Sequence, residues 1–420
     1  MTEVLSPSKL SPHQPVPDAV PEAGARDPAI HPRIAAFAED ITAWRHDFHR
    51  HPEIGFEEHR TSGIVAQKLE SWGIEVHRGY GGTGLVGRLT GRYTDRAGAN
   101  RVIGLRADMD ALPMTEDTGL PYASEIPGKF HGCGHDAHTA ILLGAARYLA
   151  ETRDFAGTVQ FIFQPAEEGL GGARAMIADG LFRDFPVDEI YGLHNATGDR
   201  VAPGHLRVGQ GVSMAGADFF DIKLIGKGSH AAHPHGAHDP IPALGALIQA
   251  LQTIVSRNLK ATEPAVLSIT QAHAGTAYNI IPETAVLSGT VRAFSDELRA
   301  QVRARITALA EHIAAAHELR AEVEIRDVFS VLTNHPEGVA HVVEVGEDLL
   351  GPARVEISQD LVLGSEDFAD MLQHAPGAFF VLGHRGSVPL HNPQYVLDDA
   401  ILPLGASFWA RLVETRLKAA

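Results

Sequence analysis

The chain has 420 residues, and its 44% hydrophobic and 21% charged residues are typical of a globular protein. Its length exceeds what one ordinary hydrophobic core organises, so we expect two domains. The formal net charge is −17 and the chain has no long basic run, which argues against a nucleic acid or an anionic membrane as its partner.

The N-terminal residues and the cysteine content bear on where the protein works. Residues 1–27 are rich in Pro, Ser and Ala, so we predict a disordered leader rather than a signal peptide. No apolar run approaches the ~20 residues that a membrane span needs. The single cysteine, Cys133, cannot form an intramolecular disulfide and fits a reducing compartment. We therefore predict a cytoplasmic protein.

Amphipathic helices and short apolar strands alternate after the leader. Apolar residues recur at helical spacing from Ile34 to Phe48 and from Ile64 to Trp72. The next segments predict two more helices, Thr139–Leu149 and Ala173–Ala178, and four strands, Leu85–Leu89, Val102–Leu105, Val159–Phe163 and Ile190–Leu193. This alternation predicts an α/β domain with a mixed, largely parallel sheet.

The pattern changes around Gly209–Gly216. The order strand, helix, strand, strand, helix, strand is predicted there, over Phe219–Ile225, Pro240–Val255, Val266–Gln271, Ala285–Arg292, Ser295–His317 and Ala321–Val328. This order is that of a ferredoxin-like α+β unit, so we predict an inserted domain over residues 212–329. A strand at Ala378–Gly383 and a closing helix at Ile401–Leu417 return the chain to the first domain, which then comprises residues 28–211 and 330–420.

Polar side chains follow several strands of the predicted sheet. Asp108 and Asp110 follow one strand, the pair Glu167-Glu168 follows the next, and His194 ends a third. Ligands gather at the carboxyl ends of strands in open α/β sheets, so these endings predict a functional site. His391 follows the last strand and can complete the group.

The segment from His131 to His138 contains the only cysteine among three histidines and an aspartate. Cys133 and His135 can offer a thiolate and an imidazole to one metal centre. A hydrolytic metal site also needs a carboxylate ligand and a separate base. Adjacent glutamates at a strand-to-loop turn can point in different directions, so Glu167 and Glu168 can share these tasks.

Each of these residues also has a purely structural interpretation. Cys133 alone would be read as a buried core thiol, and Asp108 and Asp110 can cap a turn. The segment Ser365-Glu366-Asp367 can be a helix N-terminus with Ser365 as its cap. Because the chain has 24 histidines, several near the motifs are assigned no function, namely His131, His138, His233, His235 and His238.

Taken together, the motifs point to one family. In chain order they are Arg106–Pro113, Cys133–Asp136, Glu167-Glu168, Tyr191–Asn195, Gly228–His235, Asn279–Pro282, Gly289–Arg292, Gly364–Phe368 and Leu390–Asn392. This set resembles the M20 metallopeptidase family, and more narrowly its amidohydrolase branch of hippurate, N-acyl-amino-acid and plant auxin-conjugate hydrolases. The resemblance extends from about residue 35 to the C-terminus.

The resemblance implies a role for each matching residue. It implies one or two divalent metal ions per subunit (Mn, Zn, Co or Ni), with Cys133 as the bridge, in a ligand set of Cys133, His135, Glu168, His194 and His391. Glu167 matches the general base, and Asp110 matches an acid that orients a ligand.

The inserted domain matches the family in a further way. The resemblance implies a homodimer formed through that domain, in which His230 reaches the active site of the partner subunit and stabilises the oxyanion. Asn279 and Arg292 match positions that hold a small-molecule substrate, often through its carboxylate. The expected reaction is hydrolysis of the amide bond of an N-acyl amino acid or a related small amide.

Some positions depart from the family pattern and leave the substrate open. Gly132 stands where a small residue such as Ala is usual, Phe130 where a Met is usual, and Gly228-Ser229 where the family has a double glycine. The segment 196–203 is longer than the usual turn. Hydrolytic deamination of an aromatic amine is therefore an alternative, as are a cysteine-nucleophile amidase using Cys133 and an inactive binding protein.

Overall fold

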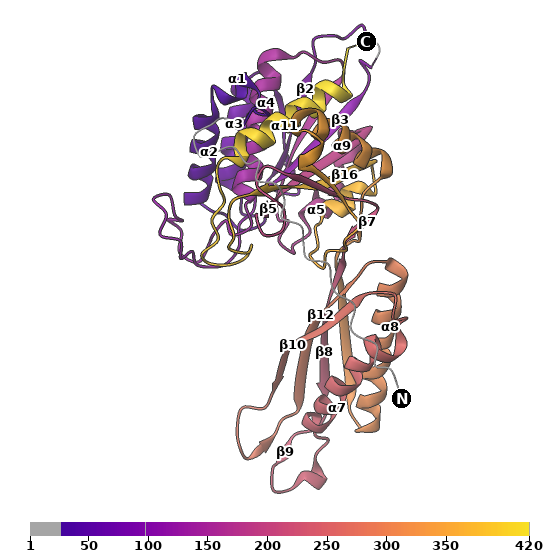
Figure 1. Ribbon diagram of the computed structural model, residues 1–420. Helices are drawn as coiled ribbons and strands as arrows, with labels where there is room; N and C mark the ends of the chain where they lie inside the picture. Colours follow the sequence, from indigo (N-terminus) through magenta and orange to yellow (C-terminus); the bar gives the residue numbers. More distant parts are fainter. Residues whose placement is uncertain (1–26, 97, 420) are drawn as a thin grey trace, which may run out of the picture.

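The computed structural model describes residues 27–96 and 98–419 of the chain. These residues form two layered parts, each built around its own sheet and drawn one above the other in Figure 1. Apart from Asp27, the predicted leader lies outside the described residues.

The larger part is built on an eight-stranded sheet. Its order is β1 (Glu75–Tyr80), β2 (Gly84–Thr90), β4 (Thr158–Gln164), β3 (Val102–Asp108), β5 (Glu189–Thr197), β16 (Gly377–His384), β6 (Leu206–Gly209) and β15 (Val355–Ser358). The central strands β4, β3, β5 and β16 run parallel to one another, and β6 and β15 form a further parallel pair. The pairs β1–β2, β2–β4 and β16–β6 are antiparallel. The predicted mixed sheet is confirmed.

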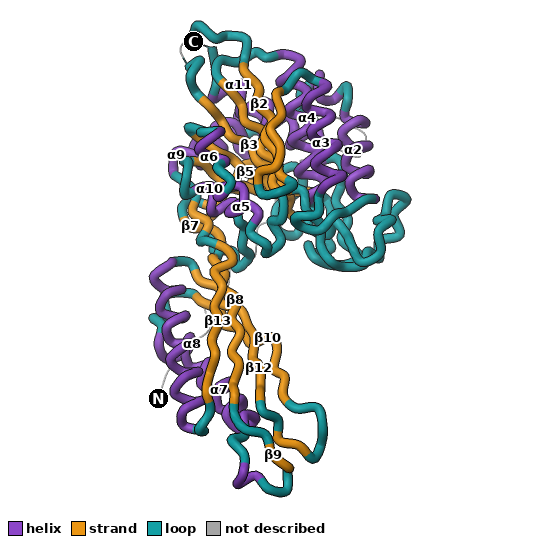
Figure 2. The backbone as a smooth tube through the Cα atoms, turned by 180° about the vertical axis from the view of Figure 1, so that it is seen from behind, coloured by secondary structure: helices purple, strands orange, loops and turns teal. Residues whose placement is uncertain are grey.

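Helices cover both faces of this sheet (Figures 1 and 2). One face packs against α1 (Pro32–Ala35), α2 (Ala38–Arg50), α3 (His59–Ser71), α4 (His135–Thr152), α9 (Pro336–Leu350) and α11 (Ile401–Arg416). The other face packs against α5 (Gly172–Ala178), α6 (Leu181–Asp184) and α10 (Phe368–Leu372). Strand β4 shows the consequence, because Phe161 and Phe163 enter one core and Ile162 enters the other. Burial on both faces explains its continuous apolar run.

The smaller part is a four-stranded antiparallel sheet with two helices on one face. Its elements in chain order are β8 (Gly216–Ile225), α7 (Pro240–Thr253), β10 (Ala265–Ala274), β12 (Thr284–Ala293), α8 (Asp296–Ala316) and β13 (Arg320–Phe329). The spatial order β10-β12-β8-β13 is that of a ferredoxin-like unit. Ser295 caps α8 as predicted, since its hydroxyl accepts from the Leu298 amide at 3.2 Å. The inserted α+β unit is confirmed.

Short elements mark the two ends of the inserted unit. At the junction with the large sheet, β7 (Val212–Met214) pairs with β14 (Leu332–Thr333). At the far tip, β9 (Ser229–His230) pairs with β11 (Ile280–Ile281), and η1 (Pro234–Gly236) follows. A π-helical turn, η2 (Ile254–Asn258), ends α7, and η3 (Pro352–Arg354) precedes β15. The predicted domain limits, 211/212 and 329/330, fall beside β7 and between β13 and β14, and stay a proposal.

Candidate metal centre

The candidate centre lies where the parallel strands of the large sheet end. Strands β3, β4 and β5 are adjacent and parallel, so their carboxyl ends meet at one edge of the sheet. Helix α4 begins at the same edge, with Gly134 at its N-cap in the left-handed conformation (φ 97°). A Cβ at Gly134 would lie 2.2 Å from Asn195 Oδ1, so only glycine fits this turn between Cys133 and His135.

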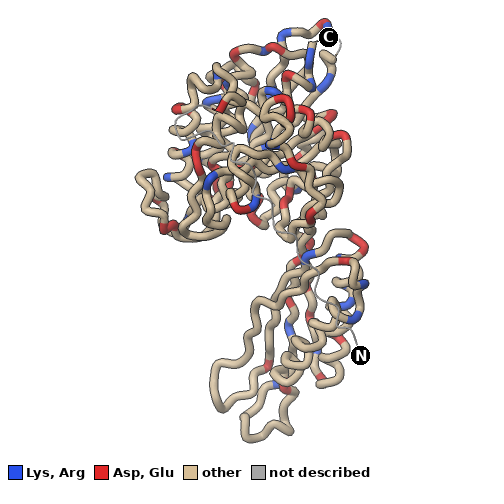
Figure 3. The backbone as a smooth tube through the Cα atoms, viewed as in Figure 1, with Lys and Arg blue, Asp and Glu red and all other residues tan. Residues whose placement is uncertain are grey.

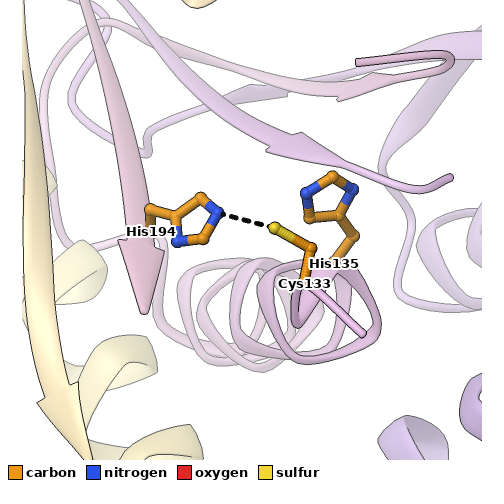
Figure 4. Close-up of side chains that lie close together, drawn as sticks. All are labelled: Cys133, His135 and His194. Carbon is orange, nitrogen blue, oxygen red and sulfur yellow. Dashed lines mark hydrogen bonds between the residues drawn. The ribbon is translucent and has the colours of Figure 1, made fainter. Parts of the chain in front are cut away.

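Two groups of potential metal ligands share the Cys133 thiol. One group is Cys133, His135 and His194, and the other is Cys133, Glu168 and His391. Within each group the ligand atoms all lie within 4.8 Å of one another. Figure 4 shows His194 pointing from β5 toward the thiol, with His135 on the other side of it at the start of α4.

Individual distances show how closely the groups approach. Cys133 Sγ lies 3.4 Å from His194 Nε2. Glu168 Oε1 lies 3.3 Å from His391 Nε2 and 3.9 Å from His135 Nε2. The structure thus brings together all five residues that the resemblance assigns to the metal ions, from four separate segments of the chain.

The backbone around two of these segments adopts an unusual conformation. Ala166, just before the glutamate pair, and His391 both have positive φ, at 55° and 62°. Such angles cost free energy in non-glycine residues and cluster at functional sites. The amide of His391 donates to the carbonyl of Gly132 at 2.9 Å, which ties the two ligand-bearing loops together.

Asp110 contacts two of the candidate ligands. One carboxylate oxygen lies 3.2 Å from His135 Nδ1, and the other accepts a hydrogen bond from the Glu168 amide at 2.9 Å. A proton on Nδ1 directed at Asp110 leaves the lone pair of His135 on Nε2. Asp110 therefore connects a carboxylate ligand with a histidine ligand, rather than capping a turn.

The donor set fits divalent metal ions. His135 Nε2 and Glu168 Oε1 are buried and have no hydrogen-bond partner within the described residues, which is costly for polar atoms. The nearby side chains of Cys133 and Glu168 raise the pKa of His391 to about 10, so this corner of the site favours positive charge. Thiolate, imidazole and carboxylate ligands suit borderline transition metals.

Glu167 is separated from solvent beside the ligands. It is buried, and it forms a further close group with His135 and Glu168. Burial, followed by the neighbouring carboxylates of Glu366 and Glu168, raises the pKa of Glu167 well above its usual range. A carboxylate with a raised pKa is suited to accept a proton near neutral pH.

A buried arginine organises the carboxylates around Glu167. The Arg106 guanidinium donates to Asp108 at 2.6 Å, to Glu366 at 2.8 Å and to Asp367 at 3.1 Å. Its Nε donates to Gln164 at 2.8 Å. Arg106 therefore supplies the positive charge for three acidic side chains that the packing removes from water.

The sequence alone did not place the segment Ser365-Glu366-Asp367, just before α10, in this network of buried charges. Its interpretation as a capped helix N-terminus is wrong for Ser365, whose hydroxyl donates to the Ala215 carbonyl at 2.6 Å, while Asp367 occupies the N-cap position. The signal was available in the motif Gly364–Phe368, which contains both Glu366 and Asp367. Their buried partner, Arg106, lies 260 residues away from Glu366 and could not be paired from the sequence.

The residues expected from the inserted domain lie in two places. His230 and Asn279 sit together at the far tip, where the Ala231 amide donates to the Asn279 carbonyl at 3.0 Å. Figure 1 places β9 at the end of the molecule opposite the large sheet, so the chain does not bring these two residues to its own Cys133. Arg292 lies at the other end of β12, where its guanidinium donates to Ser365.

No helix in the described part of the chain has the length and apolar character needed to cross a membrane.

Comparisons with known proteins agree with the geometry. The model of peptidase family M20/M25/M40 matches residues 104–415. The hippurate hydrolase of Campylobacter jejuni is 41% identical over 387 residues, covering 92% of this chain and 99% of the relative. The N-acetyl-L-cysteine deacetylase of Bacillus subtilis is 38% identical, covering 88% of this chain and 86% of the relative. The crystal structure of the Bacillus subtilis YXEP protein, described as a dinuclear metal binding peptidase from the M20 family, aligns with a TM-score of 0.77 and 34% identity, covering 92% of this chain and 100% of that one.

Proposed function

The chain belongs to peptidase family M20/M25/M40 and is an amidohydrolase, and from this premise we propose that it uses two divalent metal ions to hydrolyse the amide bond of an N-acyl amino acid or a related small amide. The observation that carries the proposal is the shared thiol. Cys133 belongs to both three-residue ligand groups, so it can bridge two ions held by His135 and His194 on one side and by Glu168 and His391 on the other.

The bound ions would polarise the scissile carbonyl and lower the pKa of water. The residues of the chain supply the rest of the chemistry. Glu167 is buried next to the ligands, so its carboxylate can take a proton from the attacking water and pass it to the leaving nitrogen. Asp110 keeps His135 and Glu168 in fixed orientations.

Arg292 supports a substrate that carries a carboxylate. Its side chain is half-buried, and burial lowers its pKa. Its guanidinium donates to the neutral Ser365 hydroxyl, and no carboxylate forms an ion pair with it among residues 27–96 and 98–419. A half-buried guanidinium without an anionic partner is suited to bind the carboxylate of an N-acyl amino acid.

The tip of the inserted unit supports a homodimer. Strand β10 is an edge of its sheet, and residues 264–282 contain no Lys, Arg, Asp or Glu. The tip is correspondingly free of red and blue in Figure 3. Tyr278 and Ile280 are exposed there. A long, uncharged edge strand is a template for pairing with another chain, and a second copy would carry His230 and Asn279 toward the Cys133 of its partner.

The cysteine-nucleophile alternative is disfavoured by the surroundings of the thiol. Burial, followed by the negative charge of Glu168, raises the pKa of Cys133, whereas a catalytic thiol needs a lowered pKa. No feature of the site favours deamination of an aromatic amine over amide hydrolysis.

The experiment that tests the function distinguishes the product of amide hydrolysis, a free amino acid, from the product of deamination, ammonia. The full chain is stripped of metal, reloaded with Mn²⁺, Zn²⁺, Co²⁺ or Ni²⁺, and given a panel of N-benzoyl and N-acetyl amino acids and substituted anilines. We expect free amino acid to appear only after reloading, with no ammonia released from the anilines. Turnover that survives complete metal removal contradicts the proposal. So does the release of ammonia from the anilines when none of the N-acyl amino acids is cleaved.

A further inference from the structure

Three buried side chains lie beneath the candidate ligands and have no role in the proposed chemistry. They are His138 on α4, Asn195 on β5 and Tyr395 in the loop after His391, and each is at most 2% exposed. His138 Nδ1 lies 2.6 Å from Asp108 Oδ1. Because a carboxylate only accepts hydrogen bonds, this nitrogen carries a proton.

The other ring nitrogen of His138 contacts Asn195 twice. The backbone nitrogen of Asn195 lies 3.1 Å from His138 Nε2, and the side-chain oxygen Oδ1 of Asn195 lies 2.7 Å from the same nitrogen. The side-chain nitrogen Nδ2 of Asn195 donates to the Tyr395 hydroxyl, also at 2.7 Å. A buried chain of polar contacts therefore runs from Asp108 through His138 and Asn195 to Tyr395.

From Asn195, this chain of contacts also reaches a candidate metal ligand. His194 Nδ1 donates to the carbonyl of Asn195 at 2.7 Å, which leaves the lone pair on Nε2, the atom 3.4 Å from Cys133 Sγ. The backbone and the side chain of Asn195 thus both contact His138, and the carbonyl of Asn195 orients His194. The Asn195 amide also packs directly against Gly134, in the turn between Cys133 and His135.

We propose that His138 is a positioning residue for the metal centre, which acts by fixing Asn195 and through it the Nε2-coordinating form of His194. The proposal rests on the two-metal function proposed above. It makes a specific prediction, because His194 belongs to only one of the two ligand groups. Loss of His138 is expected to weaken the ion held with His194 and to spare the ion held with Glu168 and His391.

The test is a titration of the metal-free full chain with Co²⁺, followed by visible and near-ultraviolet absorption. The wild type is expected to bind two ions in separable steps. In His138→Gln we expect one step to weaken by about 10–100-fold, with altered absorption bands, because loss of a residue that orients a ligand typically costs this much affinity. The other step is expected to change by less than about threefold. His312→Gln, at an exposed position of α8, is the matched control and should match the wild type.

The outcomes distinguish the two proposals. A wild type that fails to bind two Co²⁺ ions contradicts the proposed function itself. A folded His138→Gln variant with both steps and both spectra unchanged overturns the positioning role, and so does equal weakening of both steps. If His138→Gln does not fold, as judged by circular dichroism, Tyr395→Phe decides the matter, since it removes only one hydroxyl. It must weaken the same single step, and an unchanged titration overturns the proposal.

Discussion

Replacement of Arg106 by methionine tests the buried charge network beneath the active site. The substitution keeps much of the side-chain volume but removes the guanidinium that forms ion pairs with Asp108, Glu366 and Asp367. The Arg106 side chain is fully buried, and the three acids are 0–3% exposed. Removing one partner of a buried ion pair costs about 3–5 kcal/mol, because the remaining charge stays buried without compensation.

Tryptophan fluorescence can follow this effect in the large part alone. The three tryptophans of the chain, Trp44, Trp72 and Trp409, all pack in the core on one face of the eight-stranded sheet. We expect Arg106→Met to lower the urea midpoint of the metal-free protein by roughly 1–2 M, if the dependence on urea is about 3 kcal/mol per M. Arg78→Met removes an exposed ion pair with Glu70 and should change stability by about 0–1 kcal/mol.

The reasoning also predicts a pH dependence. Protonation of the three acids removes their unpaired charges, so the difference between wild type and Arg106→Met should shrink as the pH falls. A variant that unfolds at the wild-type urea midpoint at pH 7 would refute the view that Arg106 compensates these carboxylates.

Three further predictions concern catalysis and pH. Glu167→Gln should keep its metal content but lose about 10²–10⁴-fold in kcat. When the Glu167→Gln and His230→Ala variants are dissociated and mixed, the mixture should recover about a quarter of wild-type activity if the site is shared across a dimer. No recovery excludes sharing. Arg292→Met should raise KM for N-acyl amino acids at least tenfold and leave KM for an amide without the carboxylate within twofold; equal effects would contradict carboxylate binding. Although burial opposes ionisation, Arg45 and His49 hold the pKa of Asp136 well below its usual range, so Asp136 stabilises the fold above its unfolded-state pKa of about 3.9 and this contribution is lost as the pH falls below it. The stability gap between wild type and Asp136→Asn should therefore close in acid, and a gap that widens would contradict this sign.

Local patterns were sufficient to predict most of the fold. The central strands are buried on both faces, so β3, β4 and β5 appear in the sequence as short apolar runs between helices. The order of elements in the inserted unit could likewise be predicted, because apolar residues repeat with strand or helix spacing in each of them. Strands β1, β6 and β15 were not predicted, since they are short or half-exposed and lack an apolar run. Helix α9 was also missed, although it begins with a proline and Val339 and Val342 repeat at helical spacing.

The candidate site was predicted less completely. The ligand set follows from motifs, because each motif carries its own Cys, His or Glu. The supporting contacts do not, since they join segments that only tertiary packing brings together. His138 was set aside as one histidine among many, and its contacts with Asp108 and Asn195 span three separate elements. The sequence also contains no indication of how far His230 lies from Cys133 within one chain.

The metal content of three alanine variants tests the central claim most directly. After reloading with Co²⁺ and removal of free metal, elemental analysis of the full chain should give two ions in the wild type. His194→Ala and His391→Ala each remove a ligand from one group only, so each should retain about one ion, whereas Cys133→Ala removes the shared ligand and should lose both. Two ions retained in Cys133→Ala would contradict the claim that this thiol joins two metal sites.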